Sequence, residues 1–289
     1  GMIKGLPQRD RGTVAEFALI EEGVCAACPQ GVSDIDCCAL PLTSITAVIA
    51  FEKCGLRDVT ATTAEEKADS TTAGPRVLVL GGAGGVGVSA IQLAKNVYGA
   101  SHVVTTASPG KKTDLCLSLG ADRVINYREE KFEEVLRDDE GFDAILDCTG
   151  EAKRCPPLLR EGGTLVSIVA APTVEGLREW LASQDLKPGD TVWGIVSLLK
   201  SGIGGWLMNM GSGARRLKSK CNGNYYHIVG RGDGTIMANL ARYVAAGQLR
   251  AVIDRVFPLD EAPEALAHLQ EGHCAGKTVV QIVADPQEE

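Results

Sequence analysis

The sequence predicts an α/β fold built on a doubly wound parallel sheet. From residue 76 onward, short β-branched apolar runs alternate with segments of helical periodicity. A glycine-rich turn separates the first of these runs, 76–80, from the first helical segment, 86–98. The length of 289 residues and the apolar content of 45% are sufficient for such a sheet and a smaller second unit.

The alternating region predicts its elements in order. The expected strands are 76–80, 102–106, 123–126, 143–147 and 164–169, and the expected helices are 86–98, 111–119 and 129–137. This alternation implies parallel strands joined by right-handed crossovers.

The flanking regions are less regular. Before the sheet, 13–20 is a strand candidate, 33–54 is helical with a break at Pro41, and 59–75 is a polar connector. After it, 172–222 is an irregular stretch with an apolar patch at 203–208, which could be a cleft lid, a subunit contact, a quinone-facing surface or a core helix. The last expected elements are strand 225–229, helix 236–246 ended by Gly247, and strands 252–257 and 278–283 around helix 262–270.

The turn after the first strand predicts a nucleotide site. Gly82, Gly84 and Gly87 fit G-x-G-x-x-G, whose glycines make the tight turn, admit a pyrophosphate and let helix pack on strand. The helix that follows points its free N–H groups at the phosphates. The motif alone is a weak signal, because the chain has 34 glycines and a strand-to-helix turn needs glycine for steric reasons. Its position between a strand and a helix favours nucleotide binding.

The end of the second strand indicates which dinucleotide binds. An NAD site usually offers Asp or Glu there, and no acid stands between residues 107 and 112. Ser108, Lys111 and Lys112 instead offer a hydroxyl and two ammonium groups that suit a 2′-phosphate. The sequence therefore predicts NADPH. The alternative is that the two lysines only solvate the start of the next helix.

Charge and hydropathy exclude several classes of function. A net charge of −8 offers no basic stripe to a nucleic-acid backbone. No run reaches the ~20 apolar residues of a membrane span, and no secretory leader is recognisable. The sequence shows no Ser-His-Asp set, paired carboxylates or H-E-x-x-H motif, so hydrolysis is not supported.

The 10 cysteines raise the question of a metal or redox cluster. Cys25 and Cys28 followed by Cys37 and Cys38 leave the last two ligands adjacent, where tetrahedral geometry is hard to reach. We therefore expect no metal and reduced thiols, with Cys37 and Cys38 as small core residues before an apolar helix. A structural metal and a working dithiol are the alternatives.

Several blocks, taken together, resemble the quinone-oxidoreductase (zeta-crystallin) type of medium-chain dehydrogenase/reductases. They are GTVAEFALI (12–20), LPLTSITA (40–47), VLGGAGGVG (79–87), LGADRVINYREE (119–130), FDAILDCTG (142–150), GQLRAVIDRVFPLDEAPEAL (247–266) and GHCAGKTV (272–279). The last block and the apolar insert before it are most similar to a mitochondrial NADPH oxidoreductase of that family. The resemblance implies a Rossmann sheet plus a partial GroES-like β-rich catalytic domain.

The resemblance also implies roles for particular residues. Gly84, Gly85 and Val86 would hold the pyrophosphate, and Ser108, Lys112 and Tyr127 the 2′-phosphate. Thr46 would lie near the nicotinamide and Ser167 would line its face; Thr46 is also the only hydroxyl nominated as a catalytic group. His273, Cys274 and Ala275 would contact the cofactor, although the family carries arginine at the position of Ala275, and His273 could equally be a capped turn residue.

The expected activity is zinc-independent, NADPH-dependent reduction of quinones or α,β-unsaturated carbonyls. We expect a homodimer, with 192–199 as a candidate edge segment for its interface. The expected location is the cytoplasm or the mitochondrion. Family members carry about 80–90 further residues ahead of the first block, which is near the lower end for a domain. The implied division is 1–43 as a remnant of the catalytic domain, 44–230 as the NADP-binding domain and 231–289 as a return to the catalytic domain. A noncatalytic NADPH-binding protein and an enoyl-thioester reductase are the alternatives.

Overall fold

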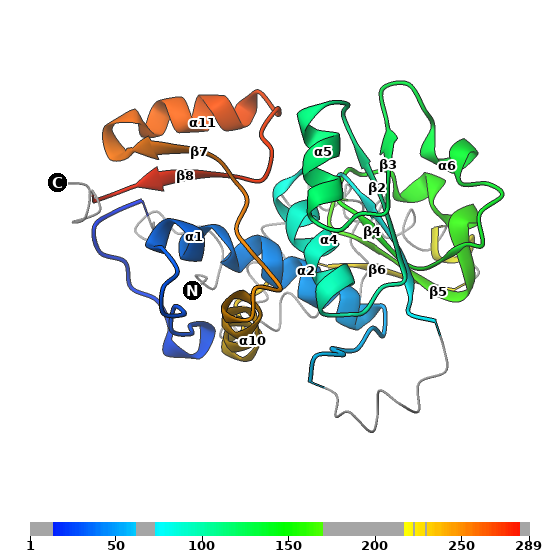
Figure 1. Cartoon of the computed structure of the whole chain (residues 1–289), viewed down its shortest axis with the longest axis horizontal. Helices are drawn as coiled ribbons and strands as arrows, with labels where there is room; N and C mark the ends of the chain where they lie inside the picture. The colour runs from blue at the N-terminus through cyan, green and yellow to red at the C-terminus, as the bar shows by residue number, and fades with distance from the viewer. Residues whose placement is uncertain (1–13, 62–72, 170–216, 222, 229, 284–289) are drawn as a thin grey trace, which may run out of the picture.

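The computed structural model describes residues 14–61, 73–169, 217–221, 223–228 and 230–283. Its larger part is a six-stranded sheet in the order β3-β2-β1-β4-β5-β6, with every neighbouring pair parallel (Figure 1). The strands are β1 (Arg76–Leu80), β2 (His102–Ala107), β3 (Arg123–Asn126), β4 (Phe142–Asp147), β5 (Leu159–Ser167) and β6 (Asn224–His227). This strand order is that of the Rossmann fold, and it confirms the predicted doubly wound α/β class.

Both faces of the sheet are buried, as the continuous apolar runs of its strands require. Val77 and Val79 of β1 face one core, and Leu78 and Leu80 face the other; all four side chains are fully buried. The first core contains side chains of α2 (Pro41–Lys53), α4 (Gly85–Asn96), α5 (Lys111–Ser118) and α10 (Gly234–Ala245). The second contains side chains of α6 (Phe132–Val135) and of the 3-10 turns η2 (Ala152–Arg154) and η3 (Pro156–Leu158).

Local signals set the ends of the helices on the first face. Pro41 opens α2, where its missing N–H costs nothing. The Asp233 carboxylate accepts from the N–H groups of Thr235 and Ile236 and so caps α10. Gly247, with φ +67°, follows the end of α10 in the left-handed conformation that ends many helices.

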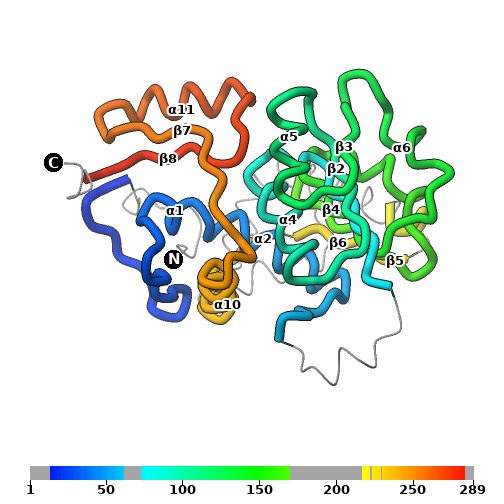
Figure 2. The backbone as a smooth tube through the Cα atoms, in the orientation of Figure 1, coloured from blue at the N-terminus to red at the C-terminus, as the bar shows by residue number. Residues whose placement is uncertain are grey.

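A second unit lies beside the sheet. Its strands β7 (Ile253–Pro258) and β8 (Lys277–Gln281) pair in parallel, and α11 (Ala262–Gln270) packs on both after the 3-10 turn η4 (Leu259–Glu261). Figures 1 and 2 place this unit at the left, with α1 (Asp34–Ala39) next to β8, while the six-stranded sheet lies at the right. The 3-10 turn η1 (Glu22–Val24) contacts α10.

Most of the predicted elements are confirmed. The strands from 76–80 to 143–147 agree within a residue, as do the helix 262–270 and the break at Pro41 in the helix 33–54. Most of the stretch 172–222, including 192–199, lies outside the described residues. The division at residues 43 and 230 stays a prediction. Helix α10, which follows the second boundary, packs on α2, which contains the first. Among the described helices, none combines the length and the apolar character needed to cross a membrane.

The expected strand over 13–20 is wrong in its described part. Residues 14–20 form no strand, and the side chains of Phe17 and Leu19 are 90% and 97% exposed. An apolar run becomes a stable strand only where a neighbouring strand completes its hydrogen-bond ladder. In the described part of the chain no strand pairs with this run.

Two further boundaries differ from prediction. The helix expected over 129–137 is only α6, because the N–H groups of Glu129 and Glu130 bond to the Asn126 carbonyl and close a turn first. The strand expected from 164 begins at Leu159, since β5 pairs with β4 on both sides of a register shift near Phe142.

The expectation for the early cysteines is also wrong. Cys28 and Cys37 form a disulfide, and Cys38 is an exposed free thiol on α1. The short helix α1 buries only Ala39, so Cys37 and Cys38 do not enter the core. The cluster therefore does not offer four thiolates to a metal.

Candidate cofactor site

The strand order changes direction between β1 and β4, and a cavity of about 360 Å³ lies at the carboxyl ends of these strands. Ligands of open α/β sheets bind at such a switch point. The lining residues are Gly81, Ala83, Gly84, Gly85, Val86, Gly87, Thr106, Ala107, Ser108, Lys112, Tyr127, Cys148, Thr149, Ile168, Gly272 and Cys274.

The glycine turn forms one wall of this cavity, and its glycines are needed for different reasons. A Cβ on Gly82 would overlap the Thr105 hydroxyl, and one on Gly87 would overlap the carbonyl oxygen of Gly81. A Cβ on Gly84 would meet nothing closer than that same carbonyl oxygen, at an ordinary 3.4 Å. The protein itself therefore has room for a side chain at Gly84, and the open side of this residue is available to a ligand.

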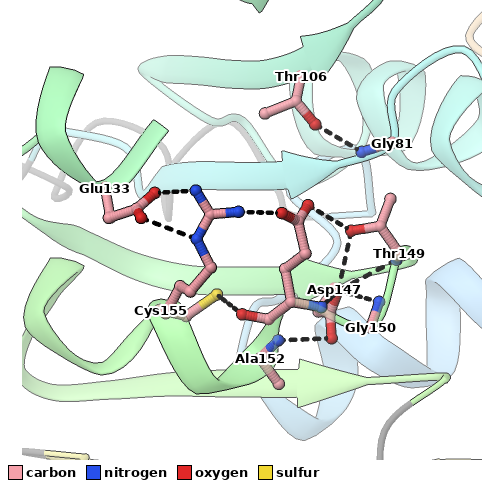
Figure 3. Close-up of polar contacts among 10 residues, drawn as sticks. Gly81, Thr106, Glu133, Asp147, Thr149, Gly150, Ala152 and Cys155 are labelled. Atoms are coloured by element: carbon pink, nitrogen blue, oxygen red, sulfur yellow. Dashed lines mark hydrogen bonds and ion pairs between the residues drawn. The ribbon is translucent and has the colours of Figure 1, made fainter. Parts of the chain in front are cut away.

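The amino end of α4 also faces the cavity. Gly84 is its N-cap and supplies no side-chain acceptor, so the first N–H groups of the helix, at Gly85, Val86 and Gly87, depend on another partner. The turn before them is held in place, because the Gly81 N–H donates to the Thr106 hydroxyl at 2.9 Å (Figure 3). Free N–H groups at a helix N-terminus bind anions such as a pyrophosphate.

The end of the cavity formed by β2 and β3 carries a single positive charge. Ser108 follows β2, Lys112 is on the first turn of α5, and Tyr127, 54% exposed, follows β3. Among the lining residues that the structure describes, Lys112 is the only charged side chain. A phosphate group would find a cation and a hydroxyl here, and no carboxylate would repel it.

A buried carboxylate shapes the opposite wall. Asp147, at the end of β4, is fully buried and accepts from the N–H groups of Thr149, Gly150, Glu151 and Ala152 at 2.9–3.0 Å (Figure 3). These bonds fix the loop that brings Cys148 and Thr149 to the cavity. Burial raises the pKa of the Cys148 thiol well above its ordinary value, so Cys148 is present as a neutral side chain.

The same loop is held from outside by an ion-pair network. Arg154 bonds to both carboxylates that flank it, Glu133 of α6, labelled in Figure 3, and Glu151. Its guanidinium carbon also lies 4.6 Å from the centre of the Phe132 ring. Partial burial raises the pKa of Glu133, but hydrogen bonds from Arg154 outweigh this effect and lower the pKa below its ordinary value. The loop after β4 is thus fixed at both its ends.

The C-terminal unit closes the cavity. Gly272 and Cys274, in the turn after α11, line it, and the Gly276 N–H donates to the Ala83 carbonyl at 2.9 Å. Gly276 has φ +86°, and a Cβ there would overlap the Val252 carbonyl oxygen, so only glycine fits. This bond joins the turn to the glycine loop.

Comparison with known proteins assigns this arrangement to a family. Residues 119–280, more than half of the chain, match the family model described as zinc-binding dehydrogenase. The chain belongs to the zinc-binding dehydrogenase family. It is similar to the quinone oxidoreductase from Coxiella burnetii, at 26% identity and a TM-score of 0.58, over 85% of this chain and 60% of that one. This likeness confirms the predicted resemblance to quinone oxidoreductases.

Two curated relatives extend the comparison. The chain is 30% identical over 274 residues to a 2-methylene-furan-3-one reductase of Solanum lycopersicum, covering 94% of this chain and 53% of that protein. It is 31% identical over 283 residues to the human mitochondrial NAD(P)H oxidoreductase RTN4IP1, covering 96% and 63%. The chain therefore spans between about half and two thirds of the length of these relatives.

The cavity brings together most of the predicted cofactor residues. They are Gly84, Gly85, Val86, Gly87, Ser108, Lys112, Tyr127 and Cys274. Gly82 packs behind the turn, and His273 is exposed beside its lining neighbours Gly272 and Cys274. Ala275 is also outside the lining, and its N–H donates to Asp254 at 3.0 Å.

Two predicted residues are turned toward other partners. The fully buried Ser167 donates its hydroxyl to Asp147, and its neighbour Ile168 lines the cavity instead. The Thr46 hydroxyl, on α2, donates to the Leu42 carbonyl at 2.7 Å. Contact of either side chain with a nicotinamide ring stays a prediction.

Sequence reasoning missed two kinds of residue. One kind is Cys148 and Thr149, which directly follow β4 and line the cavity. The sequence contained a signal for them, because Asp147 in the block 142–150 is an acid at the carboxyl end of a central strand. The other kind is a cluster of side chains of the types that ligate metals, of which only Cys274 was predicted, as a cofactor contact. Within the described ranges one group of three metal-binding side chains converges, formed by Asp254, His268 and Cys274.

Proposed function

We propose that this chain is the NADPH-binding part of a reductase that transfers hydride to quinones or α,β-unsaturated carbonyls. The observation that carries the proposal is the cavity at the switch point, where free helix N–H groups and Lys112 are arranged for an anionic dinucleotide. The names of the relatives support the reaction, and they include an NADPH-dependent alkenal/one oxidoreductase of Arabidopsis thaliana, 29% identical over 271 residues.

The residues of the cavity would divide the work of binding. The N–H groups of Gly85, Val86 and Gly87 would bind the pyrophosphate, and Ser108 and Lys112 the 2′-phosphate. Asp147 would act as a positioning residue, since it holds the loop that carries Thr149. When bound, the cofactor supplies the hydride, and the remaining task of the protein is orientation and exclusion of water.

The proton that completes the reduction has no assigned protein donor. Thr46 was the one hydroxyl nominated from sequence, and its bond to Leu42 must break before it can donate to a substrate. The Thr149 hydroxyl lines the cavity but bonds to Asp147 and Glu151. We therefore propose water as the proton source, a role that hydride transfer to an enone permits.

Two other functions are distinguishable. A noncatalytic NADPH-binding protein predicts saturable binding without turnover. An enoyl-thioester reductase is supported by the trans-enoyl reductase poxH of Penicillium oxalicum, 28% identical over 256 residues, and predicts preference for acyl chains.

The proposal extends to assembly and location. Among the described strands β6 is an outer strand of the sheet, and pairing between two copies of such a strand would form a homodimer. We propose this dimer and a cytoplasmic or mitochondrial location, and the mitochondrial location is supported by the name of the human relative. Light scattering after size exclusion measures the dimer directly.

The deciding experiment is a titration of the purified chain with NADPH and with NADH, followed by addition of a simple quinone and of a short enone. Tighter binding of NADPH together with its oxidation supports the reductase. NADPH binding without oxidation by any acceptor assigns the chain to the noncatalytic alternative. Absence of binding to either cofactor overturns the assignment of the cavity.

A further inference from the structure

Three side chains of different metal-binding type meet at the edge of the C-terminal unit. Asp254 comes from β7, His268 from α11, and Cys274 from the turn before β8. The Nε2 atom of His268 lies 2.7 Å from Oδ2 of Asp254, and one ligand atom from each residue lies within 4.8 Å of the others. Residues that are up to twenty positions apart in the sequence thus converge on one point.

The donor set and spacing suit a tetrahedral divalent cation. Zinc bonds of about 2.0–2.3 Å place neighbouring ligand atoms about 3.4–3.6 Å apart. The three ligand atoms here lie within 4.8 Å of one another, so small side-chain rotations bring them to that spacing. A carboxylate, an imidazole and a thiolate are the ligands that zinc takes in proteins. The side chains of Asp254 and His268 are 23% and 24% exposed, so water reaches the site and can occupy the fourth position.

Each candidate ligand has a further partner that orients it. Oδ1 of Asp254 accepts from the Ala275 N–H at 3.0 Å, and Nδ1 of His268 lies 3.9 Å from a Glu271 carboxylate oxygen. The Cys274 sulfur lies 3.6 Å from the Thr278 hydroxyl. Such contacts around the ligands are typical of metal sites, because they hold the imidazole and the carboxylate in the binding orientation.

We propose that Asp254, His268 and Cys274 bind one Zn²⁺ ion, with water as the fourth ligand. Binding releases the thiol proton of Cys274 to solvent. The ion links β7, α11 and the turn 271–276, and two residues of that turn line the cofactor cavity. This site goes beyond the proposed reductase. Cys274 also lines the cofactor cavity, but Asp254 and His268 do not, and the measurements below need neither cofactor nor turnover.

The first test is metal content. The full chain is loaded with Zn²⁺, dialysed against metal-free buffer and analysed by elemental mass spectrometry. We expect about one zinc ion per chain in the wild type and a loss of about tenfold or more in Cys274→Ala and His268→Gln. Unchanged zinc content in both variants, or no retained zinc in the wild type, overturns the proposal.

Two matched controls are available in the chain. His102 also faces a carboxylate, with Nδ1 3.8 Å from Asp122, but no thiol joins that pair among the described residues. Cys221 is a half-buried free thiol that packs against the second core. His102→Gln and Cys221→Ala retain the wild-type zinc content if the three-residue site holds the ion.

A second test uses only the wild-type protein, so it does not depend on the folding of a variant. Alkylation of each cysteine is followed by peptide mass spectrometry with and without Zn²⁺. Zinc protects Cys274 by about tenfold or more, a chelator removes the protection, and the exposed Cys38 reacts equally in both conditions. Equal alkylation of Cys274 with and without zinc contradicts the site. Co²⁺ added in place of Zn²⁺ gives the charge-transfer absorption of a cobalt–thiolate bond.

Discussion

The Ser167 hydroxyl on β5 donates a 2.9 Å hydrogen bond to Oδ2 of Asp147 at the end of β4, and both residues are fully buried. Oδ1 of the same carboxylate accepts the N–H groups of the loop that follows β4. One carboxylate therefore joins two strands of the sheet to a wall of the cofactor cavity. A buried charge of this kind is stable only while its acceptor positions are filled.

Replacing Asp147 by Asn should destabilise the protein by about 2–4 kcal/mol, because the amide group presents N–H donors to the Ala152 N–H and the Ser167 hydroxyl. Ser167→Ala should cost about 1 kcal/mol. Urea denaturation measures both free energies of unfolding. The exposed Asp138→Asn is the control and should stay within about 0.5 kcal/mol of wild type. An Asp147→Asn protein as stable as this control would contradict the role of the network.

Replacing Lys112 by Ala should weaken NADPH binding by about tenfold or more and leave NADH binding nearly unchanged, since only NADPH carries the 2′-phosphate. Its neighbour Lys111 is exposed, does not line the cavity and provides the matched control. Fluorescence titration with both cofactors measures the affinities. Equal losses in the two lysine variants would mean that these lysines act only through their general charge.

Gly84→Ala separates ligand contact from folding. The Gly84 backbone has φ −77° and ψ 169°, which alanine adopts, and the added Cβ has room within the protein. We expect stability within about 0.5 kcal/mol of wild type and NADPH affinity reduced by about tenfold or more. Gly87→Ala should instead lower the melting temperature, because its Cβ overlaps the Gly81 carbonyl. A Gly84→Ala protein that binds NADPH normally would place the pyrophosphate elsewhere.

Acid should destabilise the contact between Asp58 and α10. Partial burial raises the pKa of Asp58, but hydrogen bonds from Thr60, Tyr243 and Arg242 outweigh it and lower the pKa from 3.8 to about 2. The carboxylate therefore stabilises the fold above pH 3.8, and this contribution is lost as the pH falls toward 2. Wild type should lose about 1 kcal/mol more than Asp58→Asn over this range, after allowance for solvent screening. Chemical denaturation at several pH values measures the difference, with the exposed Asp260→Asn as control.

The central strands could be predicted from sequence because strands buried on both faces appear as continuous β-branched runs. The run 13–20 has the same local character, but a strand also requires a partner, and none of the described strands pairs with it. Local pattern does not contain that information. The disulfide between Cys28 and Cys37 was missed for a related reason, because it depends on how α1 sits against the preceding loop.

The cofactor site shows the same division. The glycines and Lys112 were predictable because a strand, a turn and a helix follow one another within a short segment. Ser167 and Thr46 were assigned from resemblance, and their side-chain directions depend on Asp147 and Leu42, which a motif does not reveal. The convergence of Asp254 and Cys274 requires the parallel pairing of β7 with β8, a contact between distant segments.

The bond from Gly276 to Ala83 has a consequence for synthesis of the chain. All the described strands of the nucleotide sheet lie before residue 228, whereas the turn that closes the cavity comes almost fifty residues later. A nascent chain that folds from its amino end completes the sheet first. Cofactor capture is then a late event in biogenesis, and a chain that stops short of this turn would keep the sheet but lose part of its binding site.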